Sequence, residues 1–238
     1  MTQNHGSEPV KASRGRRRLG LFGGTFDPIH VGHLDAAAAA RNALALDDIL
    51  FVPSHVPPHR SADPRATMFH RFAMVALATG GVPASRASDV ELRRTGASYT
   101  YETLTELHAD GWAPSQLFFI LGADAFAEIA QWREFDRVVE GTNLAVVGRT
   151  GTSLDAALAR TPLRPRVRPL DQAREPSAST GVYLIEAATR DVSSTRIRAE
   201  LAAGRSIAQL VPEAVGRHII KHGLYGAVDG LHGDTQVT

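Results

Sequence analysis

From Leu19 onward the chain alternates between short, continuous apolar runs and longer segments in which apolar residues recur with helical spacing. The apolar runs are Leu19–Gly23, Ile49–Pro53, Leu117–Gly122, Leu144–Gly148 and Val182–Glu186. Continuous apolar strands separated by helices indicate a parallel sheet whose two faces are both covered. The pattern therefore predicts an α/β fold, a doubly wound parallel sheet with right-handed crossovers.

Helices are predicted between and after these runs. The segments with helical spacing are His33–Leu46, Thr67–Thr79, Tyr101–Ala109, Ala125–Glu140, Leu154–Arg160, Ser194–Ala203 and Pro212–His222. Gly204 and Gly223 follow the last two and are typical helix stops, so these helices form a small C-terminal helical segment. Residues Arg164–Thr180 are rich in Arg, Pro, Ser and Thr and are predicted to form a long loop.

The two ends of the chain differ in composition from the middle. Residues 1–18 combine Ser, Gly, Pro and five basic residues with a single Glu, which predicts a disordered basic tail, and 226–238 are predicted to be a flexible C-terminal tail. One domain is expected between them, at 19–225. The first eighteen residues carry a net charge of +4 and the whole chain +1, so residues 19–238 carry −3. The acidic body argues against nucleic acid as a partner. The basic tail does not change this, because short basic tails usually only keep a chain well solvated.

The composition excludes several kinds of chemistry. The chain has no cysteine, which removes disulfides, thiolate nucleophiles and cysteine metal sites. Its only lysines are Lys11 and Lys221, so a Walker P-loop, whose Lys reaches the phosphates, is also excluded. Any anion must be held by Arg, His, backbone N–H groups or a metal. No apolar stretch approaches the roughly 20 residues that span a bilayer, which predicts no membrane association and a cytoplasmic protein.

The richest segment is residues 23–34, Gly-Gly-Thr-Phe-Asp-Pro-Ile-His-Val-Gly-His-Leu, which we call the signature segment. It follows the first predicted strand and leads into the first predicted helix. In open α/β sheets ligands bind at this edge, where a helix N-terminus offers free N–H groups. Gly23 and Gly24 would let the backbone approach a phosphate, and Gly32 would leave room for a nucleotide ring or ribose.

His30 and His33 are three residues apart at the predicted helix start, so they can face one ligand. Two imidazoles beside a phosphate can donate hydrogen bonds to charge that develops on transferring oxygens. Zinc is a weaker alternative, with His30, His33, His55 and His59 as ligands, because nothing else resembles an ordered ligand set.

The signature segment resembles the HxGH nucleotidyltransferase superfamily. The second motif of that superfamily is matched near the C-terminus by Ser193-Ser194-Thr195-Arg196-Ile197-Arg198. Hydroxyl residues there would cap a helix whose start suits a triphosphate, and Arg198 would add a charge that does not titrate. The resemblance implies a Rossmann-like fold and transfer of a nucleotidyl group, with His30, His33 and Arg198 as catalytic residues.

Four middle segments narrow the resemblance to the bacterial nicotinate-nucleotide adenylyltransferases. They are Val52–Arg60, Gly96–Leu104, Gly122-Ala123-Asp124, and Trp132. This family implies that ATP and nicotinate mononucleotide react to give deamido-NAD and pyrophosphate in NAD biosynthesis. Sister activities, phosphopantetheine adenylyltransferase or a cytidylyltransferase, share the first motif but not these segments. A catalytically silent nucleotide-binding protein on the same fold is the alternative of a different class.

The resemblance also assigns binding residues. Trp132 would stack on the pyridine ring, Thr100 would meet the nicotinate carboxylate, and His59 and Arg60 would hold the mononucleotide phosphate. The ATP-binding positions implied are Gly23, Gly24, Thr25, Phe26, Gly32, Gly122, Asp124, Ser193, Ser194 and Thr195. Mg²⁺ would be bound with the ATP phosphates and take few or no protein ligands. Whether the protein is a homo-oligomer stays open.

Overall fold

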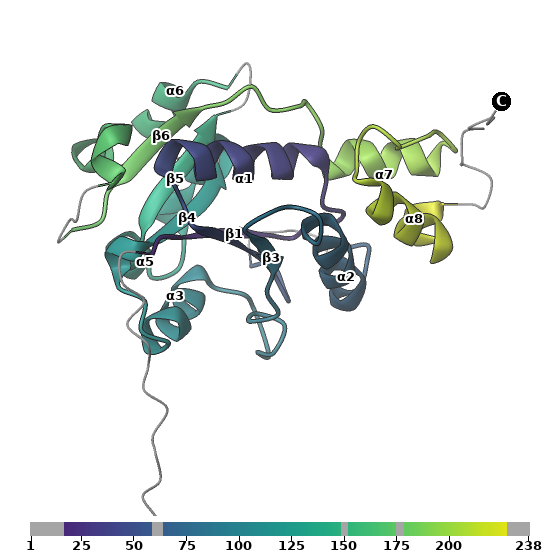
Figure 1. The fold of residues 1–238 in the computed structure, drawn as a ribbon, viewed down its shortest axis with the longest axis horizontal. Helices are drawn as coiled ribbons and strands as arrows, with labels where there is room; N and C mark the ends of the chain where they lie inside the picture. The colour runs from purple at the N-terminus through teal and green to yellow at the C-terminus, as the bar shows by residue number, and fades with distance from the viewer. Residues whose placement is uncertain (1–16, 59–63, 149–151, 175–178, 228–238) are drawn as a thin grey trace, which may run out of the picture.

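The computed structural model describes residues 17–58, 64–148, 152–174 and 179–227. Its centre is a sheet of six parallel strands in the order β3-β2-β1-β4-β5-β6 (Figure 1). The strands are β1 (Leu19–Gly24), β2 (Asp48–Pro53), β3 (Ser85–Ala87), β4 (Leu117–Gly122), β5 (Asn143–Gly148) and β6 (Val182–Glu186). The predicted doubly wound parallel sheet is therefore confirmed. The strand order reverses between β1 and β4, and ligands bind at the carboxyl ends of strands at such a point.

Helices cover both faces of the sheet, because alternate strand residues point to opposite sides. One apolar core contains Phe22, Phe51 and Ile120 with side chains of α1 (Val31–Leu44), α2 (Met68–Thr79), α7 (Ser194–Ala202) and α8 (Glu213–Lys221). The other contains Leu21, Val52 and Leu121 with side chains of α3 (Thr100–Ala109), α4 (Ala123–Ala127), α5 (Phe135–Gly141) and α6 (Leu154–Ala159). Figure 1 shows α1 lying along one face, with α3 and α5 on the other side of the strands. None of the helices in the described ranges is both long and apolar enough to cross a membrane.

Strand β3 was not predicted from the sequence. It has only three residues, Ser85–Ala87, and it pairs with β2 alone at the edge of the sheet. An edge strand this short carries no apolar run, so its pairing depends on the preceding helix α2, which packs against it.

The predicted single helix over Ala125–Glu140 is wrong. The structure has α4, a 3₁₀ turn at Ile129–Gln131 and then α5. Between them Trp132 is extended and Glu134 adopts a left-handed backbone with φ 55°. A non-glycine residue in that conformation breaks the helix without any Gly or Pro to signal it. The break presents Trp132 edge-on to the Phe119 ring, with 5.8 Å between the ring centroids.

The Arg-rich segment predicted as a loop contains two short 3₁₀ helices, Arg164–Arg166 and Leu170–Arg174. Arg166 donates hydrogen bonds to the Val139 carbonyl at 3.0 Å and to the Thr180 hydroxyl at 2.7 Å. This segment therefore fastens α5 to the strand β6 that follows it.

Both ends of the folded body make specific contacts. Arg18, which the sequence placed in the basic tail, donates its backbone N–H to the Asp47 carboxylate and its guanidinium to the Leu44 carbonyl. At the other end Tyr225 reaches back to the signature segment and Ala227 is buried. Most of the two predicted tails, residues 1–16 and 228–238, lies outside the described residues.

Candidate active site

The signature segment turns at the carboxyl end of β1 and is held there by Asp27. The Asp27 carboxylate accepts hydrogen bonds from the backbone N–H of Arg65 and of Ala66 and from the Tyr225 hydroxyl, at 2.7–3.0 Å. Phe26, the residue before it, has a left-handed backbone with φ 49°. Such strain costs on the order of 1–3 kcal/mol and persists only where the surroundings enforce it. The Asp27 contacts enforce this turn.

Burial and the neighbouring Asp27 carboxylate raise the pKa of the Tyr225 phenol above its usual value. Tyr225 is therefore protonated at physiological pH and keeps donating to Asp27. Because Tyr225 lies 198 residues after Asp27, the C-terminal end of the folded body completes the signature turn.

His30 and His33 meet at the start of α1, as predicted. His30 is buried and caps the helix, and the rings of the two histidines stack with 3.6 Å between their centroids. The Nδ1 atom of His33 accepts the backbone N–H of His30 at 3.2 Å. Since that nitrogen is an acceptor, the proton of neutral His33 is on Nε2, which is thus a hydrogen-bond donor.

The second predicted motif lies beside the first. Ser193 caps α7 by accepting the Arg196 N–H, and Ser194 donates to the Pro28 carbonyl at 2.8 Å. Arg198 donates to the Asp27 carbonyl at 2.7 Å and to the Thr195 hydroxyl at 3.2 Å. Two segments more than 160 residues apart in the chain thus form one site, with two helix N-termini and a guanidinium around the histidine pair.

Arg71 supports this site and was missed from the sequence. Its side chain is buried and donates to the carbonyls of Thr25, Ser54 and His55 at 2.7–3.0 Å. One guanidinium therefore ties α2 to the turns that follow β1 and β2. The available signal was an arginine within the mostly apolar helix Met68–Thr79, but such a residue usually lies on a solvated helix face.

A cavity of about 240 Å³ opens on the other side of the β1 and β4 strand ends. Among the predicted site residues it is lined by Gly23, Gly24, Thr25, Thr100, Gly122 and Trp132. Phe22, Ser54, Pro57, Pro58, Glu91, Ser98, Tyr99, Phe119, Leu121, Ala125 and Arg133 complete its lining. We call this cavity the apolar pocket, since most of these side chains are apolar or aromatic. Its composition is typical of a small-molecule site with a few polar groups.

One wall of the apolar pocket carries a cation that the sequence did not single out. The Arg133 guanidinium lies 4.9 Å from the centroid of the Tyr99 ring, and its neighbour Trp132 forms part of the same wall. The break between α4 and α5 exposes both residues to the cavity, and the predicted unbroken helix concealed this.

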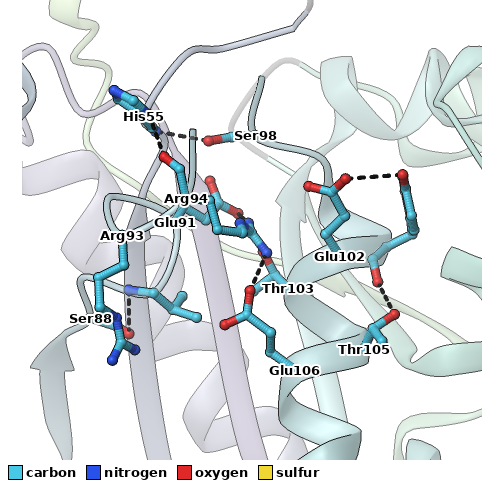
Figure 2. A network of polar contacts seen from close by, with 12 residues as sticks. His55, Ser88, Glu91, Arg93, Arg94, Ser98, Glu102, Thr103, Thr105 and Glu106 are labelled. Atoms are coloured by element: carbon cyan, nitrogen blue, oxygen red, sulfur yellow. Dashed lines mark hydrogen bonds and ion pairs between the residues drawn. The ribbon is translucent and has the colours of Figure 1, made fainter. Parts of the chain in front are cut away.

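Glu91 also lines the pocket and belongs to a polar network that Figure 2 shows. Burial raises the pKa of the Glu91 carboxyl. The hydrogen bond from the Thr103 hydroxyl at 2.7 Å and the Arg94 guanidinium at 3.6 Å act in the opposite direction, but burial has the larger effect. The same network holds His55, whose N–H donates to the Ser98 hydroxyl and whose ring contacts the Arg94 carbonyl. His55 is thus engaged in joining the loop after β2 to the loop before α3.

The remaining predicted residues have other positions. Asp124 is exposed in the first turn of α4, at the carboxyl end of β4. Phe26 is buried with its ring edge-on to His33, so its side chain supports the histidine instead of lining the pocket. A side chain at Gly32 would press on the His30 ring and the Arg190 carbonyl at 3.1–3.3 Å, so glycine there leaves room for His30. His59 and Arg60 lie outside the described residues.

Comparisons with known proteins agree with this arrangement. The sequence model of the cytidylyltransferase-like family matches residues 21–200. A probable nicotinate-nucleotide adenylyltransferase from Syntrophotalea carbinolica is 38% identical over 213 residues, covering 87% of this chain and 97% of that protein. One from Roseiflexus sp. is 39% identical over 208 residues, covering 87% and 97%.

A solved structure shares the fold. The nicotinic acid mononucleotide adenylyltransferase of Plasmodium falciparum, solved in complex with NaAD, aligns with a TM-score of 0.64 at 20% identity and covers 88% of this chain and 97% of that one. With a family model over three quarters of the sequence and relatives matched over nearly their full length, the chain belongs to the cytidylyltransferase-like family and, within it, to the nicotinate-nucleotide adenylyltransferases.

Proposed function

We propose that the protein transfers the adenylyl group of ATP to nicotinate mononucleotide, giving deamido-NAD and pyrophosphate. The observation that carries this proposal is the pairing of two different sites across the ends of β1 and β4. The histidine pair and the start of α7 suit phosphates, and the apolar pocket with Trp132 suits a flat ring. The names of the relatives at 36–39% identity support the same activity.

The reaction is an in-line displacement at the α-phosphorus of ATP. The 5′-phosphate of the mononucleotide is ionised near neutral pH and attacks directly, so no general base is required. One P–O bond forms to the acceptor phosphate while the bond to pyrophosphate breaks, and pyrophosphate leaves with its electron pair. The protein's contribution is positioning and charge neutralisation.

In this proposal the residues of the signature segment act on the transferring group. His33 donates from Nε2 to the oxygens on which charge develops, and the Asp27-anchored turn fixes its position. Arg198 and the N–H groups at the start of α7 neutralise the departing pyrophosphate.

The site suits Mg²⁺ that is bound to the ATP phosphates and has few protein ligands. The Asp27 carboxylate, the acidic group of the signature turn, already accepts three hydrogen bonds, and its neighbours are imidazoles and a guanidinium. Mg²⁺ commonly keeps several waters and binds through substrate phosphates. It would supply charge neutralisation there, as the metal ions of other phosphoryl-transfer sites do.

We further propose that the apolar pocket selects the acid over the amide form of the pyridine. Thr100 begins α3, whose first N–H groups have no partner within the helix and favour an anion. Arg133 adds a positive charge on the same side of the cavity, and Trp132 offers a stacking face. Both substrates are ordinary metabolites of the cell interior, and a cytoplasmic location is part of the proposal.

The experiment is a pyrophosphate-release assay with one acceptor at a time. Nicotinate mononucleotide and phosphopantetheine are each tested with ATP, and a cytidylyltransferase acceptor is tested with CTP. Release only with nicotinate mononucleotide, and deamido-NAD as the product, is expected. Faster release with either other acceptor would overturn the proposal in favour of a sister activity, and no release with any acceptor would favour the silent binding protein.

A further inference from the structure

A second cluster of histidines lies away from the signature segment, between α2 and α8. It consists of His70 on α2, and His218 and His222 at the end of α8. One ring nitrogen from each lies within 4.8 Å of the others, and His70 Nδ1 and His218 Nε2 are 3.1 Å apart. Within the described ranges this is the sole group of three His, Asp or Glu side chains that could reach one ion.

The spacing of the three nitrogens suits a tetrahedral metal ion. With metal–nitrogen distances of roughly 2.0–2.1 Å, two ligands at a tetrahedral centre lie about 3.3 Å apart. The His70–His218 pair is already at that separation. His222 is exposed and follows the last helical residue, so its ring can rotate the remaining distance. His218 lies in the last turn of α8 and His222 caps that helix four residues later, a spacing that directs two imidazoles to the same ion.

The chemistry of the ligands limits the kind of ion. Three neutral imidazoles suit zinc, copper or nickel, whereas Mg²⁺ and Ca²⁺ prefer oxygen ligands. His70, His218 and His222 thus offer nitrogen ligands only.

We infer that His70, His218 and His222 form a binding site for one zinc ion, which fastens α8 to α2, with a water molecule as the fourth ligand. Zinc stays in one oxidation state, so the site needs no electron donor or acceptor. It is separate from the proposed phosphate site and takes a different class of cation from the Mg²⁺ that accompanies ATP.

The position of the cluster links it to the signature turn. His70 is next to Arg71, whose guanidinium holds the carbonyls of Thr25 and Ser54. His222 precedes Tyr225, whose hydroxyl holds Asp27. An ion between these histidines therefore joins α2, which carries Arg71, to the C-terminal end of α8, which Tyr225 follows in the next 3₁₀ turn. We expect bound zinc to stabilise the fold.

The test uses the full chain without any affinity tag, freed of metal by chelation and then titrated with zinc sulfate by calorimetry. His218→Gln and His222→Gln each remove one ligand. His108→Gln is the matched control, because His108 contacts the Gly141 carbonyl far from the cluster. His33→Ala tests the alternative that zinc binds at the stacked His30–His33 pair.

We expect one zinc ion per chain. His108→Gln and His33→Ala should bind it with undiminished affinity, and His218→Gln and His222→Gln at least about tenfold more weakly. Even the loss of a residue that only hydrogen-bonds to a metal ligand costs roughly 10–100-fold in affinity. Cobalt substituted at the site should give the intense visible absorption of a tetrahedral complex, lost in the same two variants. Zinc should raise the midpoint of thermal unfolding of the unaltered chain and not that of His218→Gln. Binding that survives both cluster variants, or that disappears in His33→Ala, would overturn the inference, as would no binding at all.

Discussion

The Asp27 turn of the signature segment and the apolar pocket lie at the same strand ends, and Gly23, Gly24 and Thr25 of that segment line the pocket, yet the two are built differently. The turn at Asp27 is held by polar contacts from distant segments: Arg65 and Ala66, Arg198, and Tyr225. The apolar pocket is bounded by side chains of the loops around α3 and of the broken helix between α4 and α5, with Arg133 and Glu91 as its charged groups.

This difference matches two chemical tasks. Groups that stabilise a developing charge must be fixed before the reaction, because reorganisation during the step would cost the stabilisation they give. A pocket for a flat ring needs shape, a stacking face and a few polar groups that orient the ligand. Changes on the signature side should therefore reduce stability or turnover, and changes in the apolar pocket should mainly reduce the affinity for one substrate.

The largest effect is expected for Arg71→Met. Removing the guanidinium leaves the buried carbonyls of Thr25, Ser54 and His55 without this donor, at about 1–3 kcal/mol each. We expect the free energy of unfolding in urea to fall by at least about 3 kcal/mol. The control Arg137→Met removes an exposed guanidinium that lies over Tyr101 and should change it by about 0.5 kcal/mol or less. Equal effects of the two variants would contradict the role given to Arg71.

The second effect is expected for His33→Ala. Losing one donor to the transferring phosphate typically costs about a hundredfold in kcat, or about 2.7 kcal/mol. Steady-state kinetics with saturating substrates would measure it, with His108→Ala as a control that should retain full turnover. If His33→Ala keeps more than about a tenth of the wild-type kcat, His33 does not act on the transition state.

A smaller and more selective effect is expected for Trp132→Leu. The stacking face is worth roughly 0.5–1.5 kcal/mol beyond burial, so KM for nicotinate mononucleotide should rise about two- to thirteenfold. KM for ATP and the urea midpoint should stay nearly constant, since Trp132 is only partly buried and lies on the pocket wall. A parallel rise in both KM values would mean that the two sides of the site are not separate.

The smallest effect is expected for Glu91→Gln and appears in the pH dependence of stability. Burial raises the pKa of Glu91 above its ordinary 4.5, so the folded state holds this proton more strongly than the unfolded state. The stabilisation is complete below pH 4.5 and is lost as the pH rises through the folded-state pKa. Because Gln does not titrate, Glu91→Gln should gain stability relative to wild type as the pH rises across this window. Urea unfolding at several pH values would measure the difference, and a constant or falling difference would contradict the burial effect.

The sequence was sufficient for the features that local pattern encodes. Five strands, the helix that starts at the histidine pair and the serine-capped α7 were predicted within a few residues. The strands are continuous apolar runs, and the helices have helical spacing of their apolar residues or a hydroxyl cap. The meeting of His30, His33 and Arg198 also followed, since the two motifs resemble those of one superfamily.

The parts that were missed depend on contacts between distant residues. Nothing near Arg71 shows that its side chain is buried among backbone carbonyls, and nothing near Tyr225 points to Asp27. The break before α5 rests on the left-handed backbone of Glu134, which no local residue type requires. Arg133 lines the pocket because of that break, and Glu91 lines it because of the course of the loop before α3. Neither feature can be read from the local sequence.

In the proposed reaction the apolar pocket receives the acidic pyridine nucleotide for adenylyl transfer. The most direct measurement compares nicotinate mononucleotide with nicotinamide mononucleotide at matched concentrations, with ATP saturating and the dinucleotide product quantified. The two acceptors differ only in the group that would face Thr100 and the start of α3. The structure predicts a clearly faster rate with nicotinate mononucleotide, and equal rates, or a faster rate with the amide, would contradict the assignment.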